Sequence, residues 1–259
     1  MRPVAVLVLL MAALANAQDA RLRVLIVTGR MDPSHDWRET TPVLKTILEN
    51  AGRFDVTVTE DARGITTGSL ARYDAVLVHY NGPRFGDEAE STIEQFVRGG
   101  KGLISLHGVS YGPFFGLELR ERRWQPTSEG AWPAWPAMLG ATWKPENIGH
   151  GARHVFPVKW VDREHPIARG VEASFLANDE LYHRLDLRPE ARVIAAAFSD
   201  LKTRGTGDEE PIIWTVACGS GRTVHTTLGH DAAALRQPGV AAAIARAAEW
   251  AATGAVRPR

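Results

Sequence analysis

The chain has 259 residues, of which 44% are hydrophobic and 23% charged, and 30 basic and 30 acidic side chains give a formal net charge of zero. This composition is typical of a globular domain with enough apolar side chains for a core. No basic stripe or charge block is present, which argues against a nucleic-acid partner and against binding to a membrane surface. The single cysteine, Cys218, excludes an internal disulfide.

The N-terminus has the pattern of a secretory signal peptide. Arg2 precedes an apolar run over residues 4–14, and Ala15-Asn16-Ala17 forms a small-x-small cleavage site. The apolar run is too short to span a bilayer. We therefore predict a signal peptide over residues 1–17 and a mature protein, residues 18–259, that is periplasmic or secreted and carries no membrane anchor after cleavage.

The first half of the mature chain alternates strands with helices. The first helix is expected to begin with Thr41 as its cap and Pro42 as its first residue, and to end at Gly52. Alternation of this kind predicts βαβ units and a mostly parallel central sheet in a three-layer, flavodoxin-like α/β domain. The expected strands are 23–28, 54–59, 74–79 and 102–107, and the second expected helix is 87–98.

Residues 108–150 interrupt this rhythm and are interpreted as an insertion into one single domain. Its four tryptophans either form a platform for a sugar ring or pack the insertion onto the sheet, and the sequence leaves both interpretations open. They are Trp124, Trp132, Trp135 and Trp143. After the insertion we expect strands at 154–162 and 192–198, a hairpin of 211–217 with 222–228, and a helix at about 238–252.

Polar and aromatic side chains follow the predicted parallel strands where the strands end. Ligands of open parallel sheets bind in the crevice outside the carboxyl ends of the strands, so these side chains are expected to share a pocket. Others stand at the start of the insertion and in the polar segment 178–183. The candidates are His35, Asp36, Trp37, Tyr80, Asn81, His107, Tyr111, Glu180, Tyr182, His183 and His230.

The histidines of this group suit either a metal ion or proton transfer. Imidazole titrates near neutral pH and is the commonest metal ligand in proteins. We predict one divalent metal, zinc in the first place, and no nucleotide. The spacing of the histidines matches no compact metal motif, so the prediction of a metal site depends on the fold bringing them together. Acid–base chemistry without a metal is the alternative. The predicted ligands are His35, His107, His183 and His230.

Several segments together resemble the ThuA-like (trehalose utilisation) family over about residues 22–252. They are Ser34-His35-Asp36, GLISLHG at 102–108, EHPIARGV at 164–171, NDELYH at 178–183, and the block from Pro211 to Asp231. The resemblance implies a class I glutamine amidotransferase-like fold. It also implies a role in the utilisation of trehalose, other disaccharides or 3-keto-glycosides, and an associated zinc ion.

The sequence departs from the amidotransferases of that superfamily at one decisive position. They carry a cysteine nucleophile at the turn after the strand that corresponds to 102–106, whereas this chain has His107. Without a thiolate there, hydrolysis of glutamine by acyl transfer has no nucleophile. We therefore predict that the protein is not an amidotransferase.

The preferred hypothesis is an acid–base or metal-assisted lyase or hydrolase that acts on a sugar. A 3-keto group acidifies the C2 proton, so a base can remove it and expel the C1 substituent. His107 or His183 is the expected base, His230 or a metal the electrophile, and Glu180 or Asp36 the acid. Substrate contacts are expected from Trp37, Tyr80, Asn81, Tyr111 and Tyr182. The alternative hypothesis is a non-catalytic carbohydrate-binding or accessory protein.

Overall fold

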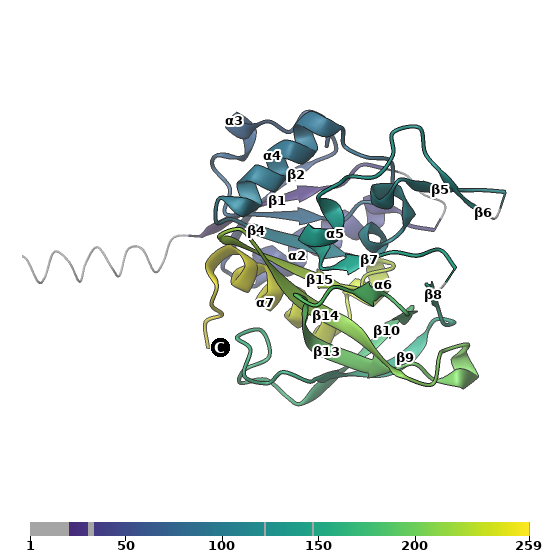
Figure 1. Ribbon diagram of the computed structural model, residues 1–259. Coiled ribbons are helices and arrows are strands. Elements are labelled where there is room, and N and C mark those ends of the chain that lie inside the picture. Colours follow the sequence, from purple (N-terminus) through teal and green to yellow (C-terminus); the bar gives the residue numbers. More distant parts are fainter. Residues whose placement is uncertain (1–20, 31–33, 122, 147, 259) are drawn as a thin grey trace, which may run out of the picture.

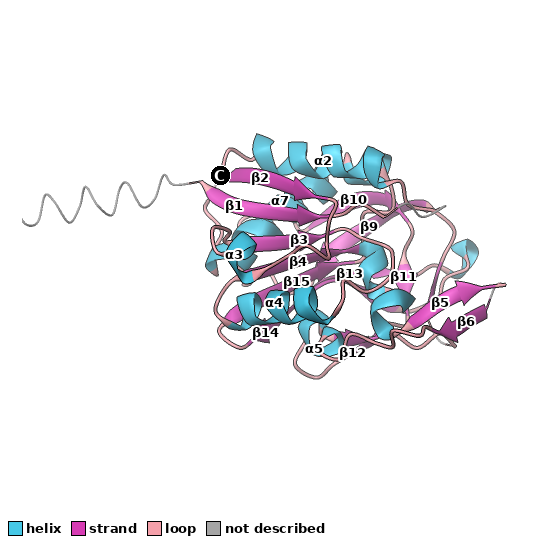
Figure 2. Ribbon diagram, turned by 90° about the horizontal axis from the view of Figure 1, so that it is seen from above, coloured by secondary structure: helices cyan, strands magenta, loops and turns pink. Residues whose placement is uncertain are grey.

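The computed structural model describes residues 21–30, 34–121, 123–146 and 148–258. The predicted signal peptide lies outside these ranges. A nine-stranded sheet, in the order β10-β9-β13-β14-β15-β4-β3-β1-β2, forms the middle layer, and helices cover both of its faces (Figures 1 and 2). The prediction of a three-layer α/β domain is confirmed.

Five neighbouring strands form the parallel half of the sheet. Their central members are short and almost entirely apolar, as expected for strands that are buried on both faces. The strand ends therefore meet at one edge, where the chain must turn out of the sheet. In spatial order these strands are β15 (Gly221–Thr226), β4 (Gly102–Leu106), β3 (Ala75–Val78), β1 (Leu22–Val27) and β2 (Phe54–Thr59).

The other half of the sheet is antiparallel and makes the whole sheet mixed. The hairpin of β14 with β15 joins the two halves. The outermost strand, β10, was not predicted, because only its last two residues, Asn178 and Asp179, belong to the polar segment singled out in the sequence. The antiparallel strands are β14 (Glu209–Cys218), β13 (Arg192–Phe198), β9 (His154–Trp160) and β10 (Ser174–Asp179).

Two apolar cores lie on the two faces of the sheet. One core packs beneath α2 (Trp37–Asn50), α6 (Ala232–Leu235) and α7 (Pro238–Thr253). The other packs beneath α3 (Thr67–Leu70), α4 (Asp87–Arg98) and α5 (Trp135–Leu139). Figure 2 shows α2 and α7 above the sheet and α3, α4 and α5 below it. Within the described ranges, no helix combines the length and apolar character needed to cross a membrane.

The predicted start of the first helix was wrong. Asp36, not Thr41, is the N-cap, and its carboxylate accepts a hydrogen bond from the backbone N–H of Arg38 at 2.9 Å. Pro42 lies inside the helix. Thr41 is buried instead, and its hydroxyl bonds that of Thr28 at 3.0 Å. The helix therefore begins directly after His35 and fixes the position of that residue.

The insertion folds into short elements that cover the carboxyl edge of the sheet. Trp132, Trp135 and Trp143 are buried, so for these three the packing interpretation holds, whereas Trp124 is only partly buried. Trp135 belongs to α5 and donates its indole N–H to the carbonyl of Val109 at 3.1 Å.

Small two-stranded sheets complete this region of the molecule, together with two short 3-10 helices. Figure 1 shows the β5–β6 hairpin projecting away from the body of the domain. The elements are η1 (His107–Ser110), η2 (Gly112–Phe115), β5 (Leu117–Arg120) with β6 (Arg123–Pro126), β7 (Ala141–Thr142) with β12 (Asp186–Leu187), and β8 (Gly149–His150) with β11 (Tyr182–His183). A further 3-10 turn, η3 (Leu201–Thr203), precedes β14.

Candidate active site

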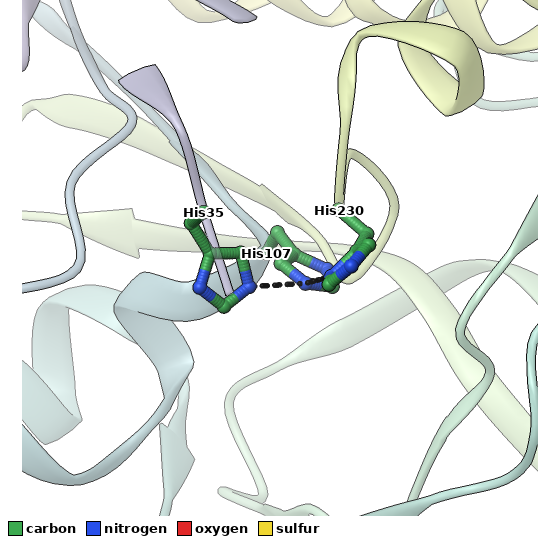
Figure 3. A group of neighbouring side chains, drawn as sticks. All are labelled: His35, His107 and His230. Atoms are coloured by element: carbon green, nitrogen blue, oxygen red, sulfur yellow. Dashed lines mark hydrogen bonds between the residues drawn. The ribbon is translucent and has the colours of Figure 1, made fainter. Parts of the chain in front are cut away.

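Three histidines from distant parts of the chain meet at the carboxyl ends of the parallel strands (Figure 3). His35 lies between β1 and α2, His107 directly follows β4, and His230 follows β15. The Nε2 atom of His107 is 3.1 Å from Nε2 of His35 and 3.3 Å from Nδ1 of His230. All three ligand atoms lie within 4.8 Å of one another. The predicted convergence of these three side chains is present in the structure.

His107 is the fixed centre of the group. Its side chain is fully buried, and its Nδ1 lies 2.7 Å from the carbonyl oxygen of Thr227. Because a carbonyl only accepts, Nδ1 carries the proton and Nε2 presents its lone pair to the other histidines. Burial and the neighbouring His35 lower the pKa of His107 well below its ordinary value, so the ring stays neutral.

The backbone at His107 is in a conformation that few residues other than glycine adopt. Its φ is +50°, in the left-handed region, at the point where β4 turns into η1. A Cβ on the next residue, Gly108, would lie 3.2 Å from Cγ of Asn81, so a side chain there would crowd the asparagine. The sharp turn thus directs the His107 ring toward the carboxyl edge of the sheet and brings Asn81 against the backbone behind it.

The other two histidines have polar partners of their own. The side-chain amide of Asn81 lies 2.9 Å from Nδ1 of His35, so it orients that ring from the side opposite His107. His230 has its Nδ1 3.3 Å from a carboxylate oxygen of Glu180. The hydrogen bond to Glu180 raises the pKa of His230 above its ordinary value. The Asn81 contact thus lies on the outer nitrogen of His35, whereas the Glu180 contact lies on the same His230 nitrogen that is nearest to His107.

Glu180 and Tyr182 approach the same centre from the segment that follows β10. The hydroxyl of Tyr182 is 2.8 Å from Nε2 of His107, and Glu180 lies 3.8 Å from that atom and 3.5 Å from Nδ1 of His150. Burial raises the pKa of Glu180, but the hydrogen bond from His230 and the nearby His150 outweigh it, so the net shift is downward. Glu180 is thus an ionised carboxylate beside a group of imidazoles.

Asp179 holds the turn that carries His230. Its buried carboxylate accepts backbone N–H bonds from Gly229 at 2.7 Å, Glu180 at 2.8 Å and His230 at 3.3 Å. Burial raises the pKa of Asp179 to about 6 despite these bonds. One side chain therefore fixes both His230 and Glu180, which gives the carboxylate a positioning role.

The structure does not bring His183 into the group. Tyr182 and His183 are consecutive residues of β11, so their side chains point to opposite sides, and Tyr182 faces His107. His183 lies instead against Gly149, where a Cβ would be 2.9 Å from its Nε2. Its assignment as a fourth metal ligand or as the base is therefore wrong in geometry. His150 pairs with Tyr182 across the two strands and is the histidine on that side.

Three other predicted residues do not line the cleft beside the histidines. The carboxylate of Asp36 is occupied in capping α2, so it is not placed to act as an acid. Trp37 has a buried indole N–H with no partner among the described residues, and the Arg38 guanidinium lies over its ring. The ring of Tyr80 packs against Phe85 and Phe114 at 4.9 and 6.0 Å. These contacts belong to the helix start and the core rather than to a substrate pocket.

A cleft of about 530 Å³ opens from the histidine group toward the insertion. The predicted residues Asn81, Tyr111 and Tyr182 line it. The hydroxyl of Tyr111 is buried and has no partner among the described residues. Sequence reasoning missed most of the other lining, because it comes from the irregular insertion and loops. That part includes Arg30, Ser34, Glu118, Leu119 and Thr127, whereas Trp124, one of the four tryptophans interpreted from the sequence, and His150 also line the cleft.

Comparisons with known proteins agree with this architecture. A ThuA-like protein from Parabacteroides merdae is 28% identical, with a TM-score of 0.73 over 93% of both chains. A second ThuA-like protein, from Bacteroides uniformis, is 17% identical, with a TM-score of 0.69 over 90% of this chain and 92% of that one.

A protein from Salmonella typhimurium LT2 that is described as cytoplasmic shares the fold at 13% identity, with a TM-score of 0.63 over 89% of this chain and 99% of that one. No curated protein matches the sequence. Residues 23–251 match the sequence family described as ThuA, trehalose utilisation. That match spans nearly the whole described chain, and the chain therefore belongs to the ThuA family.

Proposed function

We propose that the protein is a sugar-processing lyase or hydrolase that acts on a 3-keto-glycoside by acid–base chemistry at a metal-binding histidine group. One observation carries this proposal. Three imidazole nitrogens converge at the head of a cleft, and His107 is held in the tautomer that presents a lone pair there. A zinc site needs imidazoles whose outer nitrogen is held by a hydrogen bond, and His107 has such a bond to Thr227 and His35 to Asn81.

The donor set fits zinc. Tetrahedral Zn–N bonds of about 2.0–2.1 Å hold ligand atoms about 3.3 Å apart. The separations between His107 and its two neighbours, 3.1 and 3.3 Å, are close to that value. His35, His107 and His230 are therefore the residues that would hold the ion, and zinc bound there supplies a Lewis acid for a carbonyl oxygen of the substrate.

The remaining groups suit the proton transfers of an elimination. Glu180 is an ionised carboxylate at the head of the cleft, so it can take the C2 proton that the 3-keto group acidifies. The electrons of that C–H bond form a C1–C2 double bond, and the C1–O bond breaks. His150 lies on the cleft and donates Nδ1–H to the carbonyl of Gly151 at 2.9 Å. In its imidazolium form the ring carries a second proton on Nε2, and that proton goes to the departing oxygen.

This assignment changes the roles expected from the sequence. His107 was one of the two expected bases, but its Nε2 faces the other imidazoles and Tyr182 rather than open cleft. Glu180 was expected to be an acid, whereas its histidine neighbours favour the ionised form. The base is accordingly Glu180 in our proposal, and the acid is His150.

The test combines elemental analysis with substrate screening. Purified protein should hold stoichiometric zinc, and a panel of glycosides and their 3-keto forms, followed by mass spectrometry, should show loss of a 3-keto-glycoside. His107→Ala and His230→Ala should remain folded but lose metal and turnover. His154→Ala is the matched control, because this histidine bonds the carbonyl of Ala152 and does not line the cleft. Unaltered turnover in both site variants would refute the proposal.

A non-catalytic carbohydrate-binding protein is the second candidate. The observation that favours it is the aromatic lining of the cleft by Tyr111, Trp124 and Tyr182, since aromatic faces bind sugars without chemistry. A metal-free protein that binds a sugar and leaves it intact would support this candidate.

For location, we propose export to the periplasm, on the strength of the signal-peptide pattern in residues 1–17. Fractionation of cells that express the full chain tests this. Uncleaved protein in the cytoplasmic fraction would contradict it.

A further inference from the structure

We propose that the outer half of the cleft binds a flat, apolar leaving group, such as an aryl aglycone, next to the sugar at the histidines. This inference rests on the proposed function, because it names what the sugar carries at C1. The argument comes from the wall formed by Tyr182, Tyr111, Trp124 and Leu119, called here the aromatic wall.

The aromatic wall runs outward from the buried histidine in successive contacts. The ring of Tyr182 lies 4.5 Å from that of His107, Tyr111 lies 4.7 Å from Tyr182, and Trp124 lies 6.3 Å from Tyr111. Leu119 is the cross-strand partner of Trp124 in the β5–β6 hairpin. Three successive ring contacts extend farther than a single sugar ring, so the wall has room for a second group.

Exposure of the wall increases along the same path. Tyr182 is 3% exposed, whereas Leu119 is 59% exposed. Cross-strand partners share one face of a hairpin, so Leu119 and Trp124 present a joint apolar surface, and both line the cleft. An apolar ligand that covers this leucine and the neighbouring indole removes apolar surface from water, which favours binding.

Polar side chains of the outer half already have partners. Glu118 pairs with Arg120 in the same hairpin, and the hydroxyl of Thr127 donates to the carbonyl of Gly130 at 3.4 Å. Near the histidines the lining is richer in polar side chains, with Asn81 beside His35, Glu180 beside His230 and His150 beside Glu180. A sugar hydroxyl would thus find partners at the inner end, and an apolar ring would match the outer end.

Trp124 is seated rigidly, as a preformed platform requires. Its ring meets that of Trp143 edge to face at 4.5 Å. On another side it fills the space that a side chain at position 112 would occupy, since a Cβ on Gly112 would lie 2.2 Å from its Cζ3. A Gly112→Ala substitution must therefore displace the indole without altering any polar group of the site.

Calorimetric binding tests the inference without turnover. The probes are 4-nitrophenyl glucoside, methyl glucoside and trehalose, titrated into the full mature protein. The nitrophenyl glucoside should bind about tenfold more tightly than either of the others. Trp124→Ala and Gly112→Ala should remove that ratio, and Leu119→Ser should reduce it. Leu201→Ser is the control, because Leu201 is 70% exposed and lies outside the cleft lining.

The outcomes separate this inference from the proposed function. Equal affinities for the three probes, tighter binding of trehalose, or no binding of nitrophenyl glucoside would overturn the inference, even if a 3-keto-disaccharide is consumed. A ratio that depends on Trp124 would support it, even if the protein proves free of metal and turns over nothing.

Discussion

The buried His225 predicts a measurable dependence of stability on pH. Its side chain is fully buried between strands of the central sheet, with Nδ1 2.9 Å from the hydroxyl oxygen of Ser105 and its ring 4.5 Å from that of Trp214. Nε2 has no partner among the described residues. Burial lowers the pKa of His225 from an ordinary 6.5 to about 3. The folded protein therefore keeps this ring neutral where the unfolded chain protonates it.

The sign of the effect follows from the proton balance. Between pH 6.5 and about 3 the unfolded chain binds a proton at His225 that the folded protein does not, so the free energy of unfolding falls as the pH falls through this window. At pH 5 the loss relative to pH 8 is about 2 kcal/mol, from 1.36 kcal/mol per pH unit over about 1.5 units. The figure is nearly the same for any folded pKa below about 4.

The assay compares urea unfolding of the wild type and His225→Asn at pH 8 and pH 5, followed by tryptophan fluorescence. Asparagine keeps an amide near the Ser105 hydroxyl but does not titrate. The variant should be less stable at pH 8, because it leaves a cavity beside Trp214. The difference in the free energy of unfolding between the wild type and the variant should narrow by about 2 kcal/mol at pH 5. Other buried histidines titrate alike in both proteins, so they cancel, and an unchanged difference would refute the reasoning.

Three further substitutions test the packing and the site. Gly221→Ala places a Cβ 1.9 Å from the carbonyl oxygen of Val97, so it should lower the free energy of unfolding by about 3 kcal/mol. Gly68→Ala is the control, because its Cβ meets no atom closer than 4.0 Å, and it should change the free energy of unfolding by less than about 1 kcal/mol. Urea denaturation measures both effects. Asp179→Asn removes one of the acceptors that hold the His230 turn, so metal affinity should fall about 10- to 100-fold in a chelator competition, and an unchanged affinity would contradict the positioning role.

Much of the fold could be predicted because the parallel strands are local features. Short apolar runs that end in polar residues mark buried strands, and the common direction of those strands places His35, His107 and His230 at one edge. The wrong helix start was avoidable. Asp36 is among the preferred N-cap residues, and its bond from the backbone N–H of Arg38 outweighed the preference of Pro42 for a first turn.

The errors in the site depend on pairings between distant segments. Whether Tyr182 or His183 faces the histidines is decided by the pairing of β11 with β8, and a shift of one residue would exchange them. His150 enters the cleft through the same pairing. Nothing in the local sequence around either segment indicates that two-residue strands form there. Because the backbone of the insertion is irregular, sequence periodicity cannot predict such contacts.

The backbone turn at His107 determines which atom of its side chain faces the neighbouring histidines. A left-handed residue at the end of a central strand projects its side chain beyond the sheet, and His107 has this conformation at the turn for which the resemblance implies a cysteine in amidotransferases. Such a backbone costs about 1–3 kcal/mol in a residue with a side chain. Here the turn carries an imidazole whose Nδ1–H is anchored on Thr227, so only Nε2 is presented. This strand end therefore presents a fixed neutral imidazole. Its neighbours His35 and His230 come from the ends of β1 and β15, because those strands run parallel to β4.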